Sequence, residues 1–165
     1  MSTAAFLEDQ DFFRFFGIFR NVTLKALPDA HMEDVWFQPV LNQDNSSGKV
    51  SVIMKVTAPE KQNVDARFVL TDREGTVITE KCLQLQGRDG IFTGTIHTDV
   101  QNIKLWDNHS PYLYHACVEL IEQKGGVLEV VPYDIGFRRL EVIDKVIYLN
   151  GKRLVITGVN RHEWN

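Results

Sequence analysis

The sequence lacks several features that define other classes of protein. Its 165 residues contain no apolar stretch approaching the ~18 residues that a membrane-spanning helix needs. The basic residues form no run or stripe and the net charge is -4, which argues against nucleic acid and against an anionic membrane surface as partners. The start "MSTAAFLEDQD" has neither the basic nor the apolar region of a signal peptide. These absences predict a cytoplasmic protein.

Cysteine is also scarce, with only Cys82 and Cys117. In a secreted sandwich such a pair could bridge the two sheets. An immunoglobulin disulfide, however, has its tryptophan soon after the first cysteine, whereas Trp106 stands nearer the second. We therefore expect two reduced, buried thiols, as in a cytosolic protein.

Helical periodicity is missing as well, and the middle of the chain alternates with period two instead. In "KVSVIMKVT", Val50, Val52, Met54 and Val56 fall on one side, as in a half-buried strand. Further strand-like runs cover residues 33–41, 64–70, 76–85, 91–98, 112–122 and 127–142, and Pro39 indicates that the first lies at an edge. About seven strands with regular turn signals predict an all-β fold, an immunoglobulin-like antiparallel β-sandwich.

The C-terminal end does not fit that sandwich. Asn150-Gly151 predicts a tight hairpin. Its second arm, "RLVITGVN" (153–160), is nearly all apolar, which is typical of strands buried on both faces. A polar cluster, Asn160 to Glu163, follows it. Polar groups at the end of a buried barrel strand usually face an active site.

The N-terminal end is equally unusual. "EDQDFFRFFGIFRNV" (8–22) places a dense aromatic cluster among charged groups close to the start of the chain. Aromatic side chains at a terminus have little to pack on. Both ends therefore look like pieces of neighbouring domains.

Four segments resemble motifs of the family 2 glycoside hydrolases, in the order and spacing of that family. Residues 8–22 resemble the segment that closes the sugar-binding domain. "LWDNHSPYLYHACVEL" (105–120) resembles a signature of the immunoglobulin-like domain, and "DIGFRRLEV" (134–142) resembles the exit from it. "LNGKRLVITGVNRHEW" (149–164) resembles the entry to the catalytic barrel. The "EDQD" and "NRHEW" versions are most similar to β-galactosidases, especially the large subunits of two-subunit enzymes from lactic acid bacteria.

The resemblance implies three parts. Residues 1–28 would end a sugar-binding jelly-roll domain, residues 29–140 would form the immunoglobulin-like sandwich, and residues 141–165 would be a hairpin leading into the first strand of a catalytic TIM barrel. The sandwich would be the structural spacer of a β-galactosidase that hydrolyses terminal β-D-galactosides, such as lactose, with retention. A free-standing carbohydrate-binding or adhesion module is the alternative.

The resemblance also implies ligands and partners. The intact enzyme would use magnesium and sodium, whereas these residues alone would need no cofactor. Its partners would be the β-galactoside substrate, the other domains of the same chain, and a small subunit or further copies of itself.

No catalytic residue is expected within this sequence. Glycoside hydrolysis uses two carboxylates that face each other across the glycosidic bond. The acid/base of the resembling family follows an asparagine, and no Asn-Glu pair occurs here. The nucleophile of that family lies further along the barrel. These residues should therefore be inactive by themselves.

Two residues match substrate-binding positions of that family. Asp11 matches the second Asp of "EDQD", which implies contacts with galactosyl hydroxyls and a sodium ion in the intact enzyme. His162 matches the histidine of "GVNRHE", which implies a galactose contact that strengthens as charge develops on the sugar ring. The alternatives are a turn-capping carboxylate and an exposed terminal histidine. Glu8, Asp9, Arg14, Arg20, Arg161 and Glu163 are expected to have structural roles.

Other candidate residues have simpler interpretations. The histidines at 31, 97, 109 and 115 lack metal-binding spacing, so a metal site is not expected. Trp106, Tyr112 and Tyr114 could form a sugar-stacking platform, but packing in the core or at a domain interface is favoured.

Overall fold

The structure, a computed structural model, describes residues 17–18, 20–60, 62–122 and 125–160. Contacts divide the chain into one unit from Leu27 to Leu154 and a second made of Met1–Ala26 with Val155–Asn165. The regular secondary structure of the described residues consists entirely of β-strands. All of these strands lie in the first unit. The predicted all-β class is therefore confirmed. No helix in these ranges has the length and hydropathy needed to cross a membrane.

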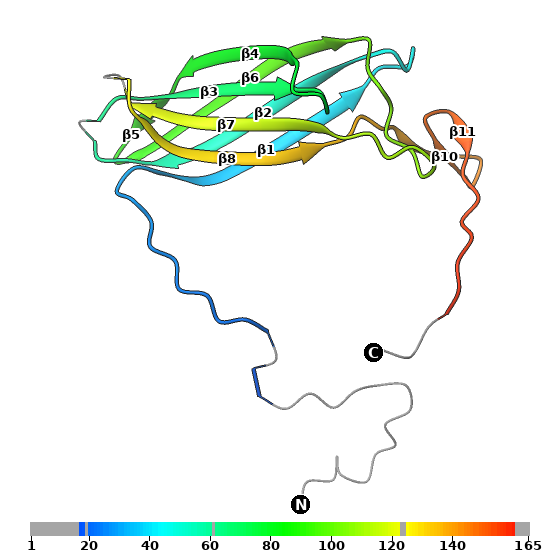
Figure 1. The fold of residues 1–165 in the computed structure, drawn as a ribbon, viewed down its shortest axis with the longest axis horizontal. Helices are drawn as coiled ribbons and strands as arrows, with labels where there is room; N and C mark the ends of the chain where they lie inside the picture. Colours follow the sequence, from blue (N-terminus) through cyan, green and yellow to red (C-terminus); the bar gives the residue numbers. More distant parts are fainter. Residues whose placement is uncertain (1–16, 19, 61, 123–124, 161–165) are drawn as a thin grey trace, which may run out of the picture. The chain divides into compact units, whose positions relative to one another are not determined.

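The strands form two four-stranded sheets and one small sheet, all antiparallel (Figure 1). The first sheet has the order β1-β2-β6-β5 and contains β1 (His31–Leu41), β2 (Ser47–Thr57), β6 (Ile91–Gln101) and β5 (Gln86–Arg88). The second has the order β4-β3-β7-β8 and contains β4 (Val77–Gln84), β3 (Val64–Thr71), β7 (Tyr114–Glu122) and β8 (Val127–Ile135). The third, which we term the exit sheet, contains β9 (Leu140–Ile143), β10 (Val146–Leu149) and β11 (Lys152–Arg153).

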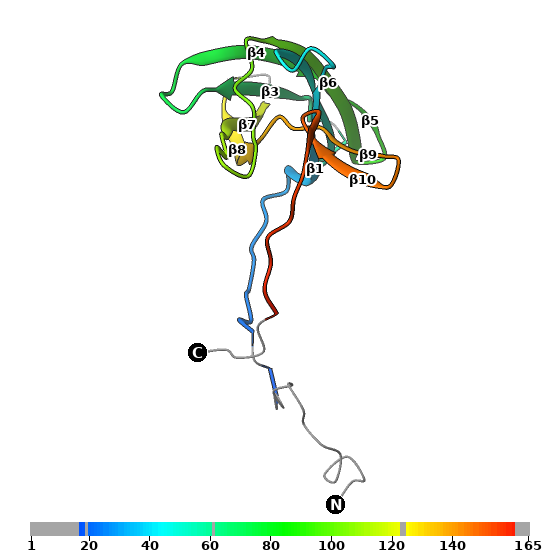
Figure 2. The same ribbon diagram turned by 90° about the vertical axis from the view of Figure 1, so that its right-hand side faces the viewer.

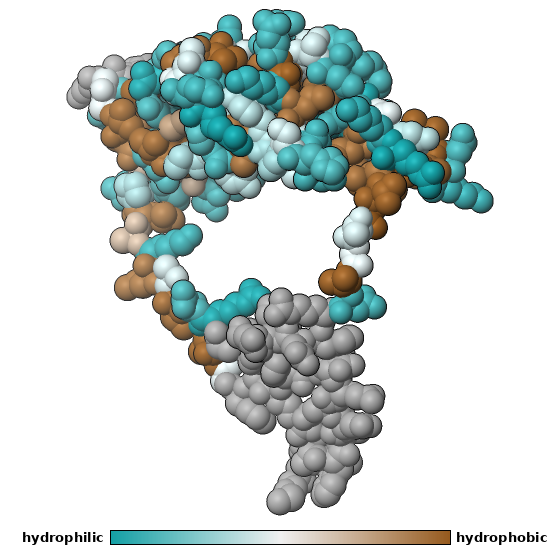
Figure 3. All heavy atoms as spheres, turned by 45° about the vertical axis from the view of Figure 1, so that its right-hand side comes forward, coloured by the Kyte–Doolittle hydropathy of each residue, from teal (hydrophilic) through white to brown (hydrophobic). Residues whose placement is uncertain are grey.

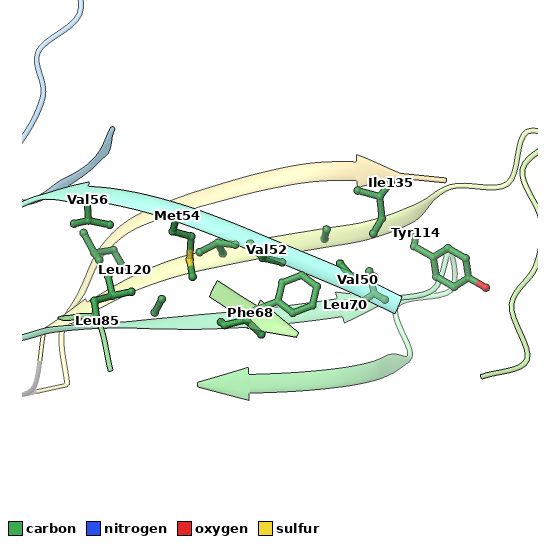
Figure 4. Close-up of a cluster of buried hydrophobic side chains, with 14 of the residues drawn as sticks. Val50, Val52, Met54, Val56, Phe68, Leu70, Leu85, Tyr114, Leu120 and Ile135 are labelled. Atoms are coloured by element: carbon green, nitrogen blue, oxygen red, sulfur yellow. The ribbon is translucent and has the colours of Figure 1, made fainter. Parts of the chain in front are cut away.

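The two four-stranded sheets pack face to face around one hydrophobic core (Figures 2 and 4). The predicted inward face of β2 is confirmed, because Val50, Val52, Met54 and Val56 are all buried. Buried side chains from the second sheet face them. These are Phe68 and Leu70 from β3 and Tyr114, Val118 and Leu120 from β7. Alternation along each strand thus produces the sandwich.

Strands β1 and β8 meet along one side of the sandwich. The Met32 backbone N–H donates to the Glu129 carboxylate at 2.6 Å. Further along, the rings of Phe37 and Tyr133 stack with centroids 5.3 Å apart. These contacts join the edges of the two sheets directly.

Both of these edge strands carry a proline. Pro39 lies in β1 and Pro132 in β8, and each strand pairs with one neighbour among the residues that the structure describes. The edge position predicted from Pro39 is confirmed. A proline offers no N–H for pairing with a further strand, so it suits an edge.

The expected single strand over 127–142 is wrong in its second half. Strand β8 ends at Ile135, and the chain begins β9, in a different sheet, only at Leu140. Beyond Ile135 the carbonyl of Phe137 accepts from the Trp106 N–H at 3.0 Å, so the backbone there bonds to the loop before β7 instead of extending the ladder.

The hairpin at Asn150-Gly151 is confirmed, but its long apolar arm is not a strand. Asn150 and Gly151 have φ values of 52° and 78°, as a tight two-residue hairpin requires. Strand β11 stops at Arg153, and Val155, Ile156 and Val159 beyond it are exposed. Among the described residues β11 pairs only with β10, so nothing continues the ladder.

The two cysteines are free thiols, as predicted, but they are not buried as predicted. Cys82 is exposed and Cys117 is half-buried. Cys82 in β4 stands opposite Arg67 of β3, and Cys117 in β7 stands opposite Val69 of β3. Arg67 and Val69 lie on the outer face of the second sheet, so both cysteines point outward, with β3 between them. The two Cα atoms are therefore separated by at least two strand spacings, about 9.5 Å. A disulfide requires Cα atoms within roughly 7 Å of each other.

Candidate functional site

The two predicted substrate-binding residues, Asp11 and His162, lie outside the described residues. The same holds for Glu8, Asp9, Arg14, Arg161 and Glu163. Their assignments remain predictions. The functional geometry that the structure does describe comes from the other three motifs.

Those three motifs converge at one end of the sandwich. The Trp106 backbone N–H, in the loop before β7, donates to the carbonyl of Phe137 at 3.0 Å. The Asn150 side-chain amide, in the β10–β11 turn, donates to the carbonyl of Trp106 at 3.0 Å. We term this cluster the junction. It consists of Trp106, Gly136, Phe137, Arg138, Arg139 and Asn150.

Asn150 is the buried polar centre of the junction, with 6% of its surface exposed. Its backbone N–H donates to the Arg139 carbonyl at 2.8 Å, and its Oδ1 accepts from the Arg139 N–H at 2.9 Å. Its carbonyl accepts from the Asn45 side chain at 3.1 Å. A residue that was expected only to form a turn therefore also connects three separate segments. Asparagine suits both tasks, because it tolerates positive φ and carries a donor and an acceptor.

Arg139 extends these connections to the loop between β1 and β2. Its Nε donates to the Glu141 carboxylate at 2.9 Å. Its Nη1 donates to the Asn42 carbonyl at 2.8 Å and to Asn45 Oδ1 at 2.9 Å. The planar guanidinium reaches all three acceptors at once, which the single ammonium of a lysine would not reproduce.

Trp106 packs tightly inside the junction. A Cβ added at Gly136 would lie only 3.0 Å from three of its side-chain atoms. The Arg138 guanidinium lies over the indole, 4.6 Å from the ring centroid, at a distance suited to a cation–π interaction. Glycine at 136 is therefore required by a close approach.

The neighbouring tyrosines pack in the core, as favoured from the sequence. Tyr112 and Tyr114 are buried and meet edge to face at 5.0 Å, and Tyr114 meets Phe137 in the same way at 5.4 Å. The Tyr114 hydroxyl accepts from the Lys104 N–H at 2.8 Å, and burial raises the pKa of this phenol. These two rings are thus unavailable as a sugar-stacking platform.

A groove of about 400 Å³ opens beside the junction. Its described lining includes Phe37 and Pro39 from β1, Tyr133 and Asp134 from β8, and Trp106 and Arg138. Asp134 is the single carboxylate in this lining, and its Oδ1 lies 2.6 Å from His115 Nδ1. Glycoside hydrolysis needs two opposed carboxylates, so the described lining does not supply that chemistry.

Three of the four described histidines, His31, His97 and His115, have separate ring partners. Their ring nitrogens contact the Pro28 carbonyl from His31, the Ser51 hydroxyl from His97 and the Asp134 carboxylate from His115. Within the described ranges, no three His, Cys, Asp or Glu side chains gather closely enough to hold a metal ion.

The sequence did not predict the role of the junction's polar residues. Arg139 and Asn150 each lie inside a family-like motif, yet nothing in either motif indicates that the two residues meet. Asn45 had only a turn-like context. The one available signal was that the three motifs occur in this chain in the order and spacing of the resembling family, which is consistent with a shared structural task.

Comparisons with known proteins follow the same division of the chain. Residues 30–138 match "Glycosyl hydrolases family 2". Residues 140–165 match "Glycosyl hydrolases family 2, TIM barrel domain". The boundary between the two matches falls at Arg139, inside the junction.

Curated relatives and solved structures agree with these matches. The chain is 42% identical over 165 residues to the β-galactosidase large subunit of Lactobacillus acidophilus and 44% identical over 166 residues to that of Leuconostoc lactis. Each alignment covers 99% of this chain and 25% of the relative, so the chain spans about a quarter of their length.

The fold is similar to that of a β-glucuronidase from Parabacteroides merdae. The TM-score is 0.69 at 24% identity, over 82% of this chain and 17% of that one. The first family match alone covers more than half of the sequence, from residue 30 to residue 138. The chain therefore belongs to glycosyl hydrolase family 2.

Proposed function

We propose that this chain is the central, non-catalytic part of a β-galactosidase and acts as a rigid spacer between its sugar-binding and catalytic domains. The junction is the observation that carries this proposal. It fixes the exit sheet to the end of the sandwich through the hydrogen bonds of Asn150, which is buried. The exit sheet lies at the start of the segment that matches a TIM-barrel domain. A spacer needs such a fixed exit direction.

The proposed organisation retains three parts. Residues 1–28 end a jelly-roll domain, residues 29–140 form an immunoglobulin-like sandwich, and residues 141–165 lead into the barrel. The immunoglobulin-like assignment is supported by the two antiparallel sheets and by β3 and β7 lying side by side in the second sheet. The family match over residues 30–138 supports similar limits.

The proposed reaction is hydrolysis of terminal β-D-galactosides, such as lactose, with retention. A barrel beyond these residues would supply both carboxylates, one as acid/base and one as nucleophile. Asp11 would bind galactosyl hydroxyls and sodium, a hard cation for which a carboxylate oxygen is a suitable ligand. His162 would hydrogen-bond the sugar in the transition state. None of the described residues is assigned to magnesium.

The proposed setting is a cytoplasmic enzyme with a partner subunit. Two relatives are named as large subunits, which supports association with a small subunit. Association of several identical copies is the other arrangement that we keep.

The full-length protein tests this proposal directly. We expect it to hydrolyse a chromogenic β-galactoside and to leave the corresponding β-glucuronide intact, whereas residues 1–165 alone should hydrolyse neither. Replacing His162 by phenylalanine in the full-length protein should lower kcat by about 10²-fold, the usual effect of losing one transition-state hydrogen bond. Preference for the glucuronide would overturn the substrate assignment. Turnover by residues 1–165 would overturn the spacer assignment.

A further inference from the structure

The exit sheet belongs to two domains by two different criteria. By sequence, β9 to β11 lie within the match to the TIM-barrel domain, which begins at residue 140. By contacts, they lie in the same compact unit as the sandwich, which extends to Leu154. The junction explains the second assignment, because Asn150 and Arg139 tie the small sheet to the loops of the sandwich.

One face of the exit sheet carries exposed apolar side chains. Leu140, Val142 and Ile147 have 63%, 71% and 36% of their surface exposed. Val142 stands directly opposite Ile147, and Leu140 is two residues before Val142, so the three share a face. We term them the exit patch. Hydrophobic surface gathers at this end of the sandwich in Figure 3.

The exit patch continues a face that is already partly covered. Leu149 stands opposite Leu140 on the same face, yet Leu149 is buried. Strand β9 is also an edge strand, since β10 is its one pairing partner within the described part of the chain. An apolar face beside a free strand edge is a surface that a partner normally covers.

We propose that the remainder of the barrel domain in the full-length protein docks on the exit patch. This inference rests on the proposed function. The occupant follows from position in the chain, because the patch lies inside the segment that matches the barrel domain and the rest of such a domain would follow directly. A short covalent connection gives this occupant a high effective concentration, ahead of any separate molecule.

Docking makes the exit sheet a shared element. The sandwich holds one part of it through the junction, and the barrel covers the exit patch. The two domains then lose contacts together when either one opens, so they unfold as one cooperative unit.

The experiment uses the full-length protein with Val142→Lys and a matched control. The control is Val127→Lys, which replaces another exposed valine, 52% exposed, at the end of β8 that is far from the junction. A milder variant, Val142→Ala, serves if the lysine prevents folding. Urea unfolding is followed together with limited trypsin digestion, with mass spectrometry scoring cuts after Lys145, Lys152 and Arg153.

Docking predicts that Val142→Lys separates one unfolding transition into two. It also predicts at least tenfold faster cleavage in the exit sheet, with a smaller change for Val142→Ala and none for Val127→Lys. Equal behaviour of Val142→Lys and Val127→Lys would overturn the proposal. A change in sedimentation without faster cleavage would also overturn it, because it would identify a second copy or a separate subunit as the occupant. Galactoside hydrolysis is measured separately, so loss of the proposed function and loss of docking are distinguishable.

Discussion

Asn150 and Arg139 bind each other twice across the junction. The Asn150 backbone N–H donates to the Arg139 carbonyl at 2.8 Å, and the Arg139 N–H donates to Asn150 Oδ1 at 2.9 Å. The first residue belongs to the turn of the exit sheet, and the second ends the segment that leaves the sandwich. This reciprocal pair ties the turn of the exit sheet to the end of the sandwich.

Replacing Asn150 by glycine and by alanine separates its two roles. Glycine keeps the positive φ but leaves the Arg139 N–H and the Trp106 carbonyl without their partner, at roughly 1–3 kcal/mol for each buried group. Alanine loses the same bonds and adds about 1 kcal/mol for the left-handed backbone. We expect the free energy of unfolding, measured in urea on residues 1–165, to fall in the order wild type, Asn150→Gly, Asn150→Ala. Equal stability of Asn150→Gly and wild type would show that the side-chain bonds contribute nothing.

Gly136→Ala tests the close approach to Trp106. The added methyl must displace the indole, and overpacking of this kind destabilises by about 1–3 kcal/mol. Gly126→Ala is the matched control, because its Cβ would meet nothing within 4 Å. Thermal unfolding should show a lower Tm for the first variant only. Similar Tm values for both variants would contradict the packing argument.

The two thiols should react with a thiol reagent at different rates in the native protein. Burial, with a smaller contribution from the Glu119 carboxylate, raises the pKa of Cys117 and so lowers its thiolate fraction at a given pH. Cys82 is exposed. At pH 8 we expect a fast phase from Cys82 and a slow phase from Cys117, with only the slow phase left in Cys82→Ser. Absence of reactive thiols in unfolded, unreduced protein would instead demonstrate a disulfide.

Asp44 should contribute to stability in a defined acidic range. The backbone N–H groups of Ser46 and Ser47, together with the Ser47 hydroxyl, hold the pKa of Asp44 at about 2, below its usual 3.8. A lowered pKa stabilises the fold above pH 3.8, and that contribution disappears as the pH falls through 2. The stability difference between wild type and Asp44→Ala should therefore shrink between pH 4 and pH 2. A constant difference over this range would contradict the assignment.

The limits of the folding unit can be tested by trimming. Residues 27–154 keep every strand that the structure describes, whereas residues 27–140 lose Asn150 and its bonds to Trp106 and Arg139. We expect the longer chain to unfold cooperatively with nearly the stability of residues 1–165. The shorter chain should be less stable by about 2 kcal/mol or more, from the unpaired buried groups. Identical urea midpoints for both chains would show that the exit sheet is not part of the unit.

Local patterns predicted most of the sandwich but not the junction. Alternation in β2, the edge position of Pro39 and the turn at Asn150 each depend on neighbours within a few residues. Strand β5 was missed because three residues are too few to show an alternating pattern. Its central residue is a glycine, at a position where a Cβ would lie 2.4 Å from Phe92. The contacts of Asn45 with Arg139 and Asn150 span 94 and 105 residues, so no local period contains them.

Prolines occupy β1 and β8, two of the four outer strands of the sandwich, and this affects how the chain can fold during synthesis. In a protein with several β-rich domains, strands of one domain emerge from the ribosome while strands of the next are still unpaired. An open edge invites pairing between the wrong domains. Pro39 and Pro132 leave β1 and β8 unable to offer a complete ladder to a nascent strand. These two edges are therefore poor templates for the β-strands of a domain that is made later.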